Sequence, residues 1–237
     1  MQKQYLNSWQ VQLSLDKALI IFTIIAIPLL LYSRVLYSRF KAQEYLESAL
    51  ACLEKARALT QDEIVRKSLF YQEAISSLRS SIALNSMDGR SYFEYGQAIY
   101  DLSEDSSLFS SLDMDAMGLR GGLDGFYKLS RAYYTNAIMC EPTNAIYHLR
   151  LGSLFDKTGS TDEAGREFKN ALKLDGQNVS IHVYLAQYFL SKGNNAEFNF
   201  HLNKVIDSFD FSLRGGGTIG ALVHDFIKKI GREDLLR

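Results

Sequence analysis

The feature that most constrains the fold of this chain is a repeat with a period of 34 residues in its C-terminal half. The stretch that starts at Ala145 aligns with the stretch that starts at Val179. The matched pairs are His148 and His182, Leu151 and Leu185, Gly152 and Ala186, Phe155 and Phe189, and Gly159 and Gly193. A period of this length indicates stacked units, since one unit cannot bury its apolar face alone.

Within the first of these units, Leu-Gly precedes an aromatic residue, a glycine marks a turn, and Ala164, Phe168 and Ala171 follow on a second helix. This pattern resembles that of the tetratricopeptide repeat (TPR) family, in its membrane-anchored bacterial form. The resemblance implies antiparallel helix pairs in which small residues let the two helices approach closely. Large side chains then fill the grooves between neighbouring pairs.

The resemblance extends upstream in a modified form. Tyr92, Tyr95, Gly96 and Ile99 resemble a first helix, and Ser130, Tyr134, Ala137 and Pro142 resemble its second helix. An insertion of roughly 20 residues separates them, relative to the family unit. Earlier still, Ala74, Leu78 and Ser81 resemble another second helix, whose partner would be 43–58. After the glycines at 215–217, the amphipathic segment 218–230 is typical of a helix that caps the stack.

The sequence therefore predicts an all-α protein. We expect a TPR-type helical-hairpin solenoid of about three to four repeats, one with a long insertion, together with a single N-terminal transmembrane helix and a C-terminal capping helix. The predicted parts are an N-terminal tail (1–16), a transmembrane anchor (17–37), the solenoid (38–210) with its inserted loop (101–126), and the capping helix (211–237).

The anchor prediction rests on the uncharged run 18–33, which is rich in Ile and Leu. It is a little shorter than the about 20 residues that a spanning helix needs. Apolar neighbours at 11–15 and 35–37 extend it, so that Lys17 and Arg34 can reach the interfaces. Trp9, Tyr32 and Tyr37 occupy positions suited to interfacial aromatics.

An apolar run near an N-terminus can also be a cleaved signal peptide or a buried core helix. A cleaved signal peptide needs a small-residue cleavage site, which the residues after the run do not offer. A buried core helix needs a polar face, which the run lacks. We therefore expect a single-pass protein of the bacterial inner membrane. The basic residues on the two sides nearly balance, and the common arrangement of a short internal tail favours an extracytoplasmic repeat domain.

Composition and motifs argue against catalysis and nucleic-acid binding. The net charge is −1, from 26 basic and 27 acidic residues, so no basic field is available to bind a phosphate backbone. The four histidines show no metal-ligand spacing, and the glycine-rich stretch 118–125 lacks the order of a phosphate-binding loop. We expect no enzymatic activity, no cofactor, no metal and no small-molecule substrate. His148 and His182 are interpreted as packing or groove-lining residues.

In the family that the sequence resembles, the first helix of each pair lines a concave face that binds other proteins. The residues expected to meet a partner there are Phe93, Gln97, Tyr100, Leu149, Ser153, Asp156, Val183 and Gln187. Any one of them could instead line a solvated groove. Some family members bind acidic C-terminal tails through basic and amide side chains at set groove positions. In this sequence the comparable positions hold Phe93, Gln97, Leu149 and Ser153, which argues against binding of such tails.

The insertion is a second candidate surface. Its apolar residues are expected to dock on the solenoid or on a partner: Leu108, Phe109, Leu112, Met114 and Met117. The predicted function is that of a membrane-anchored protein–protein interaction scaffold, an accessory or assembly subunit of a larger membrane protein complex. The alternative is a peptide-capturing adaptor, or a regulator of a cell-envelope biosynthesis or export enzyme. The expected partners are other protein subunits, membrane proteins in particular, and the lipid bilayer through residues 17–37.

Overall fold

The computed structural model describes residues 2–105, 107–108, 121–208 and 218–232, and every regular element in these ranges is a helix. For residues 2–16, 18, 19, 21, 61, 208, 218 and 219 it describes the backbone alone. The chain divides into two compact units, Met1–Asp88 and Gly89–Arg237, and each is described by itself.

The first unit is a helical hairpin. Helix α1 (Gln2–Ala58) is followed by a short 3-10 helix (Gln61–Glu63) and by α2 (Ile64–Leu84), which packs against α1. The buried residues of α1 recur every three or four positions, so that they share one face: Ala42, Leu46, Ala49, Leu53 and Ala56. Ser81 near the end of α2 donates a hydrogen bond to the carbonyl oxygen of Ala42 (2.8 Å). This bond joins the C-terminal end of α2 to α1 at Ala42.

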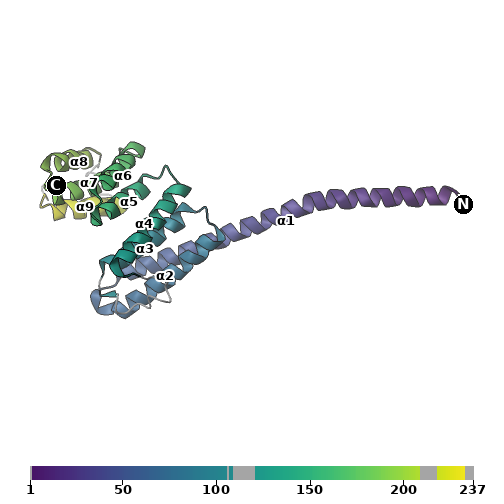
Figure 1. The fold of residues 1–237 in the computed structure, drawn as a ribbon, viewed down its shortest axis with the longest axis horizontal. Helices are drawn as coiled ribbons and strands as arrows, with labels where there is room; N and C mark the ends of the chain where they lie inside the picture. Colours follow the sequence, from purple (N-terminus) through teal and green to yellow (C-terminus); the bar gives the residue numbers. More distant parts are fainter. Residues whose placement is uncertain (1, 106, 109–120, 209–217, 233–237) are drawn as a thin grey trace. The chain divides into compact units, whose positions relative to one another are not determined.

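Helix α1 joins the apolar segment to this hairpin without a break (Figure 1). It runs through Pro28, and it is the one described helix long and apolar enough to cross a membrane, judged by length and composition. The side chains of Phe22, Ile25 and Leu29 are each more than half exposed. The predicted tail, the predicted anchor and the first helix of the first hairpin therefore lie on one continuous helix.

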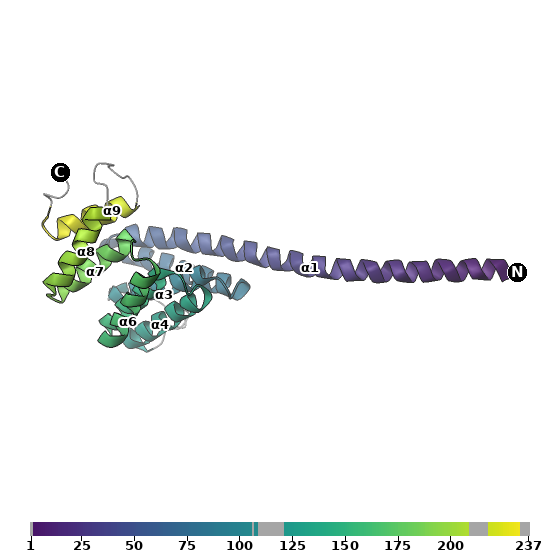
Figure 2. The ribbon, with the colours of Figure 1, turned by 90° about the horizontal axis from the view of Figure 1, so that it is seen from above.

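The second unit contains three further hairpins and a final helix (Figure 2). Helix α3 (Gly89–Glu104) pairs with α4 (Gly122–Cys140), α5 (Ala145–Lys157) with α6 (Thr161–Leu174), and α7 (Val179–Ser191) with α8 (Asn195–Ser208). Helix α4 also contacts α5, α6 contacts α7, and α9 (Thr218–Lys229) packs on α7. These hairpins confirm the predicted all-α, TPR-like repeat fold and the C-terminal capping helix.

Small residues allow the close packing of each hairpin. A Cβ atom at Gly96 would lie 2.9 Å from Cδ1 of Tyr134, and one at Gly152 would lie 2.7 Å from Cδ1 of Phe168. In the α7–α8 hairpin, Ala186 takes the place of these glycines and shares a buried cluster with the aliphatic Leu202. Where the second helix carries an aromatic ring, the first helix has glycine opposite it. Where the second helix carries a smaller aliphatic side chain, the first helix has alanine.

The turns between paired helices depend on the glycines that the repeat predicts. Gly159 and Gly193 have φ angles of 81° and 69°. In each turn the residue after the glycine donates a backbone hydrogen bond to an aromatic residue five positions earlier, from Ser160 to Phe155 (2.8 Å) and from Asn194 to Phe189 (2.9 Å). A left-handed glycine with this bond is a common way to end a helix, and a side chain there would be strained.

The predicted inserted loop, 101–126, is too long at both ends, because α3 continues to Glu104 and α4 begins at Gly122. Leu108, one of the apolar loop residues expected to dock, is fully buried. The other four, Phe109, Leu112, Met114 and Met117, lie outside the described residues.

Candidate protein-binding surface

The predicted residues on α3 are already engaged with neighbouring helices. The Phe93 ring stacks on that of Tyr147 with their centroids 4.7 Å apart. Gln97 donates from Nε2 to Oδ1 of Asp101 (2.7 Å) and accepts a hydrogen bond from the Tyr134 hydroxyl (3.0 Å). Burial raises the pKa of Tyr100, so its hydroxyl stays neutral. These side chains hold α3, α4 and α5 together, and each keeps part of its surface accessible.

The predicted residues on α5 differ in their surroundings. Leu149 is buried in a cluster formed by α5, α6 and α7. Ser153 donates a hydrogen bond to the carbonyl oxygen of Leu149 within its own helix (2.9 Å). Asp156 forms an ion pair with Lys192, just past the end of α7 (2.8 Å). The ion pair therefore connects the first helices of two successive hairpins.

Leu149, Val183 and Gln187 come together in one small groove between α5, α7 and α9. Its cavity volume is about 100 Å³. The lining residues are Ile146, Leu149 and Arg150 of α5, Ser180, Val183, Tyr184 and Gln187 of α7, and Leu222 of α9. We call this the α5–α7 groove. It has an apolar floor, since Leu149 and Val183 are 3 % and 1 % exposed, and polar groups at its rim.

Arg150 is a lining residue that the sequence prediction missed. Its guanidinium lies over the ring of Tyr184, 5.5 Å from the centroid, and its Nε atom is buried with no hydrogen-bond partner among the described residues. A signal for both residues was available, because Arg150 and Tyr184 follow Leu149 and Val183 directly and are themselves 34 residues apart. Adjacent positions on the inner side of a first helix can both line one groove.

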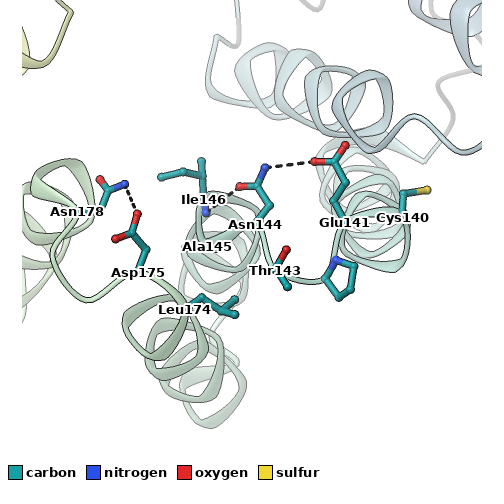
Figure 3. Close-up of a pocket in the computed structure, with 10 residues that line it drawn as sticks. Cys140, Glu141, Thr143, Asn144, Ala145, Ile146, Leu174, Asp175 and Asn178 are labelled. Carbon is teal, nitrogen blue, oxygen red and sulfur yellow. Dashed lines mark hydrogen bonds between the residues drawn. The ribbon is translucent and has the colours of Figure 1, made fainter.

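A second hollow, of about 660 Å³, lies between the α4–α5 and α6–α7 connections (Figure 3). Its amide side chains act as helix caps: Oδ1 of Asn144 accepts from the Ile146 backbone (3.2 Å), and Oδ1 of Asn178 accepts from Ser180 (3.0 Å). Each asparagine also donates to the acidic residue three positions earlier, Glu141 or Asp175. The polar groups of this hollow thus have a structural role at the start of α5 and α7.

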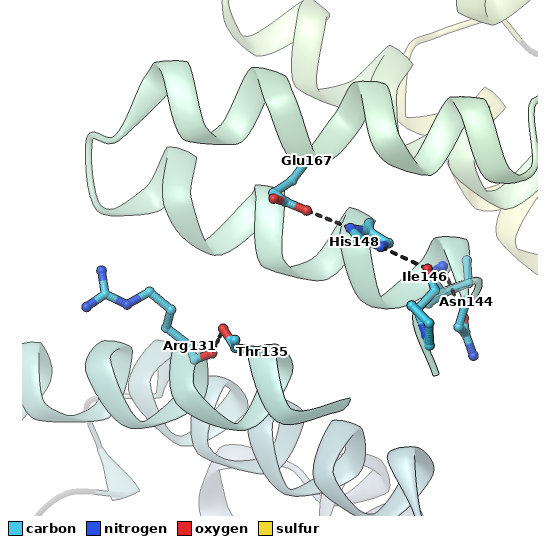
Figure 4. A network of polar contacts seen from close by, with 7 residues as sticks. Arg131, Thr135, Asn144, Ile146, His148 and Glu167 are labelled. Atoms are coloured by element: carbon cyan, nitrogen blue, oxygen red, sulfur yellow. Dashed lines mark hydrogen bonds and ion pairs between the residues drawn. The ribbon is translucent and has the colours of Figure 1, made fainter. Parts of the chain in front are cut away.

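The histidines at the repeated position connect each first helix to two other segments, as Figure 4 shows for His148. Nδ1 of His148 lies 2.6 Å from Oε2 of Glu167, and its Nε2 lies 3.3 Å from the carbonyl oxygen of Pro142. His182 makes the equivalent contacts one repeat later, with Nδ1 of His201 (2.8 Å) and the carbonyl oxygen of Gly176 (3.1 Å). The interpretation of both histidines as packing residues agrees with these contacts.

The His182–His201 pair makes the fold sensitive to acid. Burial, together with the smaller electrostatic effect of the neighbouring His182, lowers the pKa of His201 to about 4. Below the ordinary histidine value of 6.5 the unfolded chain therefore binds a proton that the folded chain does not. We expect the free energy of unfolding to fall by roughly 2 kcal/mol as the pH drops from about 6.5 to about 4, with no contribution above that range.

This pH dependence can be measured by urea unfolding at successive pH values. His201→Asn is the informative variant, because an asparagine amide can take the place of Nδ1 but does not bind a proton in this range. We expect its stability curve to be flatter than that of the natural chain between pH 6.5 and 4. Two curves with the same slope would show that another group causes the acid sensitivity.

The chain is similar in fold to several solved structures. No family model and no curated protein matches the sequence. Among solved structures, the crystal structure of MamA has a TM-score of 0.44 at 14 % identity, covering 70 % of this chain and 84 % of that one. A MamA structure from Desulfovibrio magneticus RS-1 has a TM-score of 0.43 at 15 % identity, covering 71 % and 94 %. The Arabidopsis OM64 TPR domain has a TM-score of 0.39 at 19 % identity, covering 59 % and 93 %.

Proposed function

We propose that this chain with a TPR-like repeat fold is a membrane-anchored scaffold that holds other protein subunits, as an accessory or assembly subunit of a larger membrane complex. The observation that carries the proposal is the continuity of α1. One helix includes both an exposed apolar segment of membrane-spanning character and the first helix of the first hairpin. An anchor of this kind confines the repeats to a surface and raises their effective concentration near membrane partners.

The α5–α7 groove supports the binding part of the proposal. A concave site with an apolar floor and a few polar groups at its rim is the usual form of a site that takes a segment of another molecule. The membrane is proposed to be the bacterial inner membrane, with the repeats on the extracytoplasmic side. Protease protection on closed vesicles tests that orientation: the repeats should resist protease in inverted inner-membrane vesicles, and digestion there would contradict it.

The small volume of the groove favours a second candidate, a peptide-capturing adaptor. A cavity of about 100 Å³ suits one side chain of a short segment, whereas a permanent subunit needs a larger interface. Purification of the full-length chain in mild detergent separates the two candidates. A stoichiometric membrane partner supports the scaffold, and substoichiometric soluble clients support the adaptor. Recovery of the chain without any partner would count against both.

A matched pair of variants shows whether the groove is responsible for the binding. Gln187→Trp places a bulky ring at the groove, where Gln187 is half-buried, and we expect it to reduce partner recovery at least about tenfold, which corresponds to 1.4 kcal/mol. Asn170→Trp introduces the same ring at an exposed position on α6 and should leave recovery unchanged. Quantitative mass spectrometry of the purified material measures both. Equal recovery with the two variants would place the binding surface elsewhere.

A further inference from the structure

The α5–α7 groove contains a cation without an anionic partner in the described part of the chain. Nε of Arg150 is buried and has no hydrogen-bond partner, and no ion pair of Arg150 is found among the described residues. An arginine side chain remains charged at all physiological pH values. A buried donor that stays unsatisfied costs free energy, of the order of 1–3 kcal/mol. An anionic group bound in the groove would supply the counter-charge that the guanidinium lacks.

The neighbours of Arg150 do not supply that negative charge. The Tyr184 ring lies against the guanidinium, and such a contact is compatible with a carboxylate in the plane of the guanidinium. Burial raises the pKa of Tyr134, as it does that of Tyr100, so both hydroxyls near Arg150 stay neutral. Three acidic groups on α3 and α5 have other contacts: Asp156 pairs with Lys192, Glu104 pairs with Lys157, and Asp101 accepts a hydrogen bond from Gln97.

The remainder of the groove is largely apolar. It is lined by Arg150 together with four aliphatic residues, Ile146, Leu149, Val183 and Leu222. Leu222 on α9 is 38 % exposed, so the groove remains open on that side. A cavity of about 100 Å³ has room for one aliphatic side chain. The chemistry of the groove therefore combines one site for a negative charge with one adjacent site for an aliphatic group.

We infer that the α5–α7 groove recognises a partner peptide segment in which an Asp or Glu carboxylate meets Arg150 and a neighbouring aliphatic side chain enters the cavity. The inference rests on the proposed function and adds the chemistry of the partner to it. Arginine and carboxylate can form two parallel charge-assisted hydrogen bonds, which give direction as well as affinity. The aliphatic contact excludes water and so strengthens the ion pair.

The test uses the full-length chain in nanodiscs of phosphatidylcholine and a display library of random linear 12-residue peptides. We expect the enriched peptides to carry Asp or Glu at a fixed spacing from Leu, Ile or Met. Fluorescence anisotropy then measures Kd for a selected peptide. Arg150→Gln should weaken binding at least about tenfold, since loss of a charge-assisted hydrogen bond has an effect of this size. Lys169→Gln, which removes an exposed cation on α6, should leave Kd unchanged.

A charge exchange separates recognition from a structural role of Arg150. Arg150→Glu should abolish binding of the selected peptide and restore binding when its acidic residue is replaced by lysine. Two results would overturn the inference and leave the proposed function standing. One is that the peptides selected from the library show no enrichment of Asp or Glu, and the other is that the Kd for Arg150→Gln stays within twofold of the natural value. Peptides whose binding is unaffected by Gln187→Trp would instead count against the groove as a protein-binding site. Concentration-dependent self-association lost in Arg150→Gln would identify a second copy of the chain as the occupant and would also overturn the inference.

Discussion

Truncation of Phe168 to alanine is expected to lower the free energy of unfolding by about 3–5 kcal/mol, the largest loss among the single core substitutions considered. The ring is 5 % exposed and packs between α5, α6 and α7 in the cluster that also contains Leu149 and Ile181. Its removal leaves a cavity at the centre of two successive hairpins. Urea unfolding of the full-length chain in detergent, followed by circular dichroism, measures the change.

The same substitution at an exposed ring serves as the control. Phe200 on α8 is 52 % exposed, so Phe200→Ala should cost less than about 1 kcal/mol. A second substitution tests the origin of the effect. Gly152→Ala should cost about 1–3 kcal/mol alone, because its Cβ would lie 2.7 Å from the Phe168 ring. In the Phe168→Ala background it should cost much less, and additive losses would mean that the two positions do not interact.

The second large effect concerns the membrane. We expect Ile25→Asp combined with Leu29→Asp to release the chain from membranes, because each aspartate at the centre of a spanning helix costs about 3 kcal/mol. Two such changes correspond to roughly 6 kcal/mol, more than a thousandfold in partition. Both side chains are exposed on α1, so the substitutions disturb no packing in the protein itself. The measurement is the fraction of chain that stays in the pellet after alkaline carbonate extraction.

The control for the anchor is Leu69→Asp. Leu69 on α2 is 58 % exposed, close to the 60 % of Leu29, and it lies outside the apolar segment. This variant should remain in the pellet like the natural chain. If the double aspartate variant also stays there, α1 is not the membrane anchor and the proposed scaffold loses its attachment to the bilayer.

The positions and pairing of the repeated helices could be predicted because their signal is local. The 34-residue period, the turn glycines and the apolar spacing place α5 to α8, and weaker versions of the same pattern place α3, α4 and the α1–α2 hairpin. The helix at 218–229 follows from its amphipathic spacing in the same way. Each of these signals lies within one helix or between adjacent helices, where the geometry of a helix fixes which residues share a face.

The surface prediction was less complete. Of the eight candidate residues, the structure brings Leu149, Val183 and Gln187 into one groove, whereas Phe93 and Gln97 take part in contacts among α3, α4 and α5. The groove also depends on Leu222, which the sequence placed only on a capping helix. Whether a side chain on an inner face is accessible depends on the helices that pack beside it, and a single helix pattern does not contain that information.

The helical hairpins and the apolar segment at the N-terminal end can be recognised from local patterns, because periodicity and the absence of charge are properties of neighbouring residues. Three features follow only from the folded structure: the apolar segment and the first hairpin share one helix, His182 meets His201, and Arg150 in its apolar groove has no counter-ion among the described residues. These facts depend on contacts between residues far apart in the chain, or on the choice between continuing and ending a helix. The choice is settled over many turns at once, since the energy of one helical turn is too small to decide it alone.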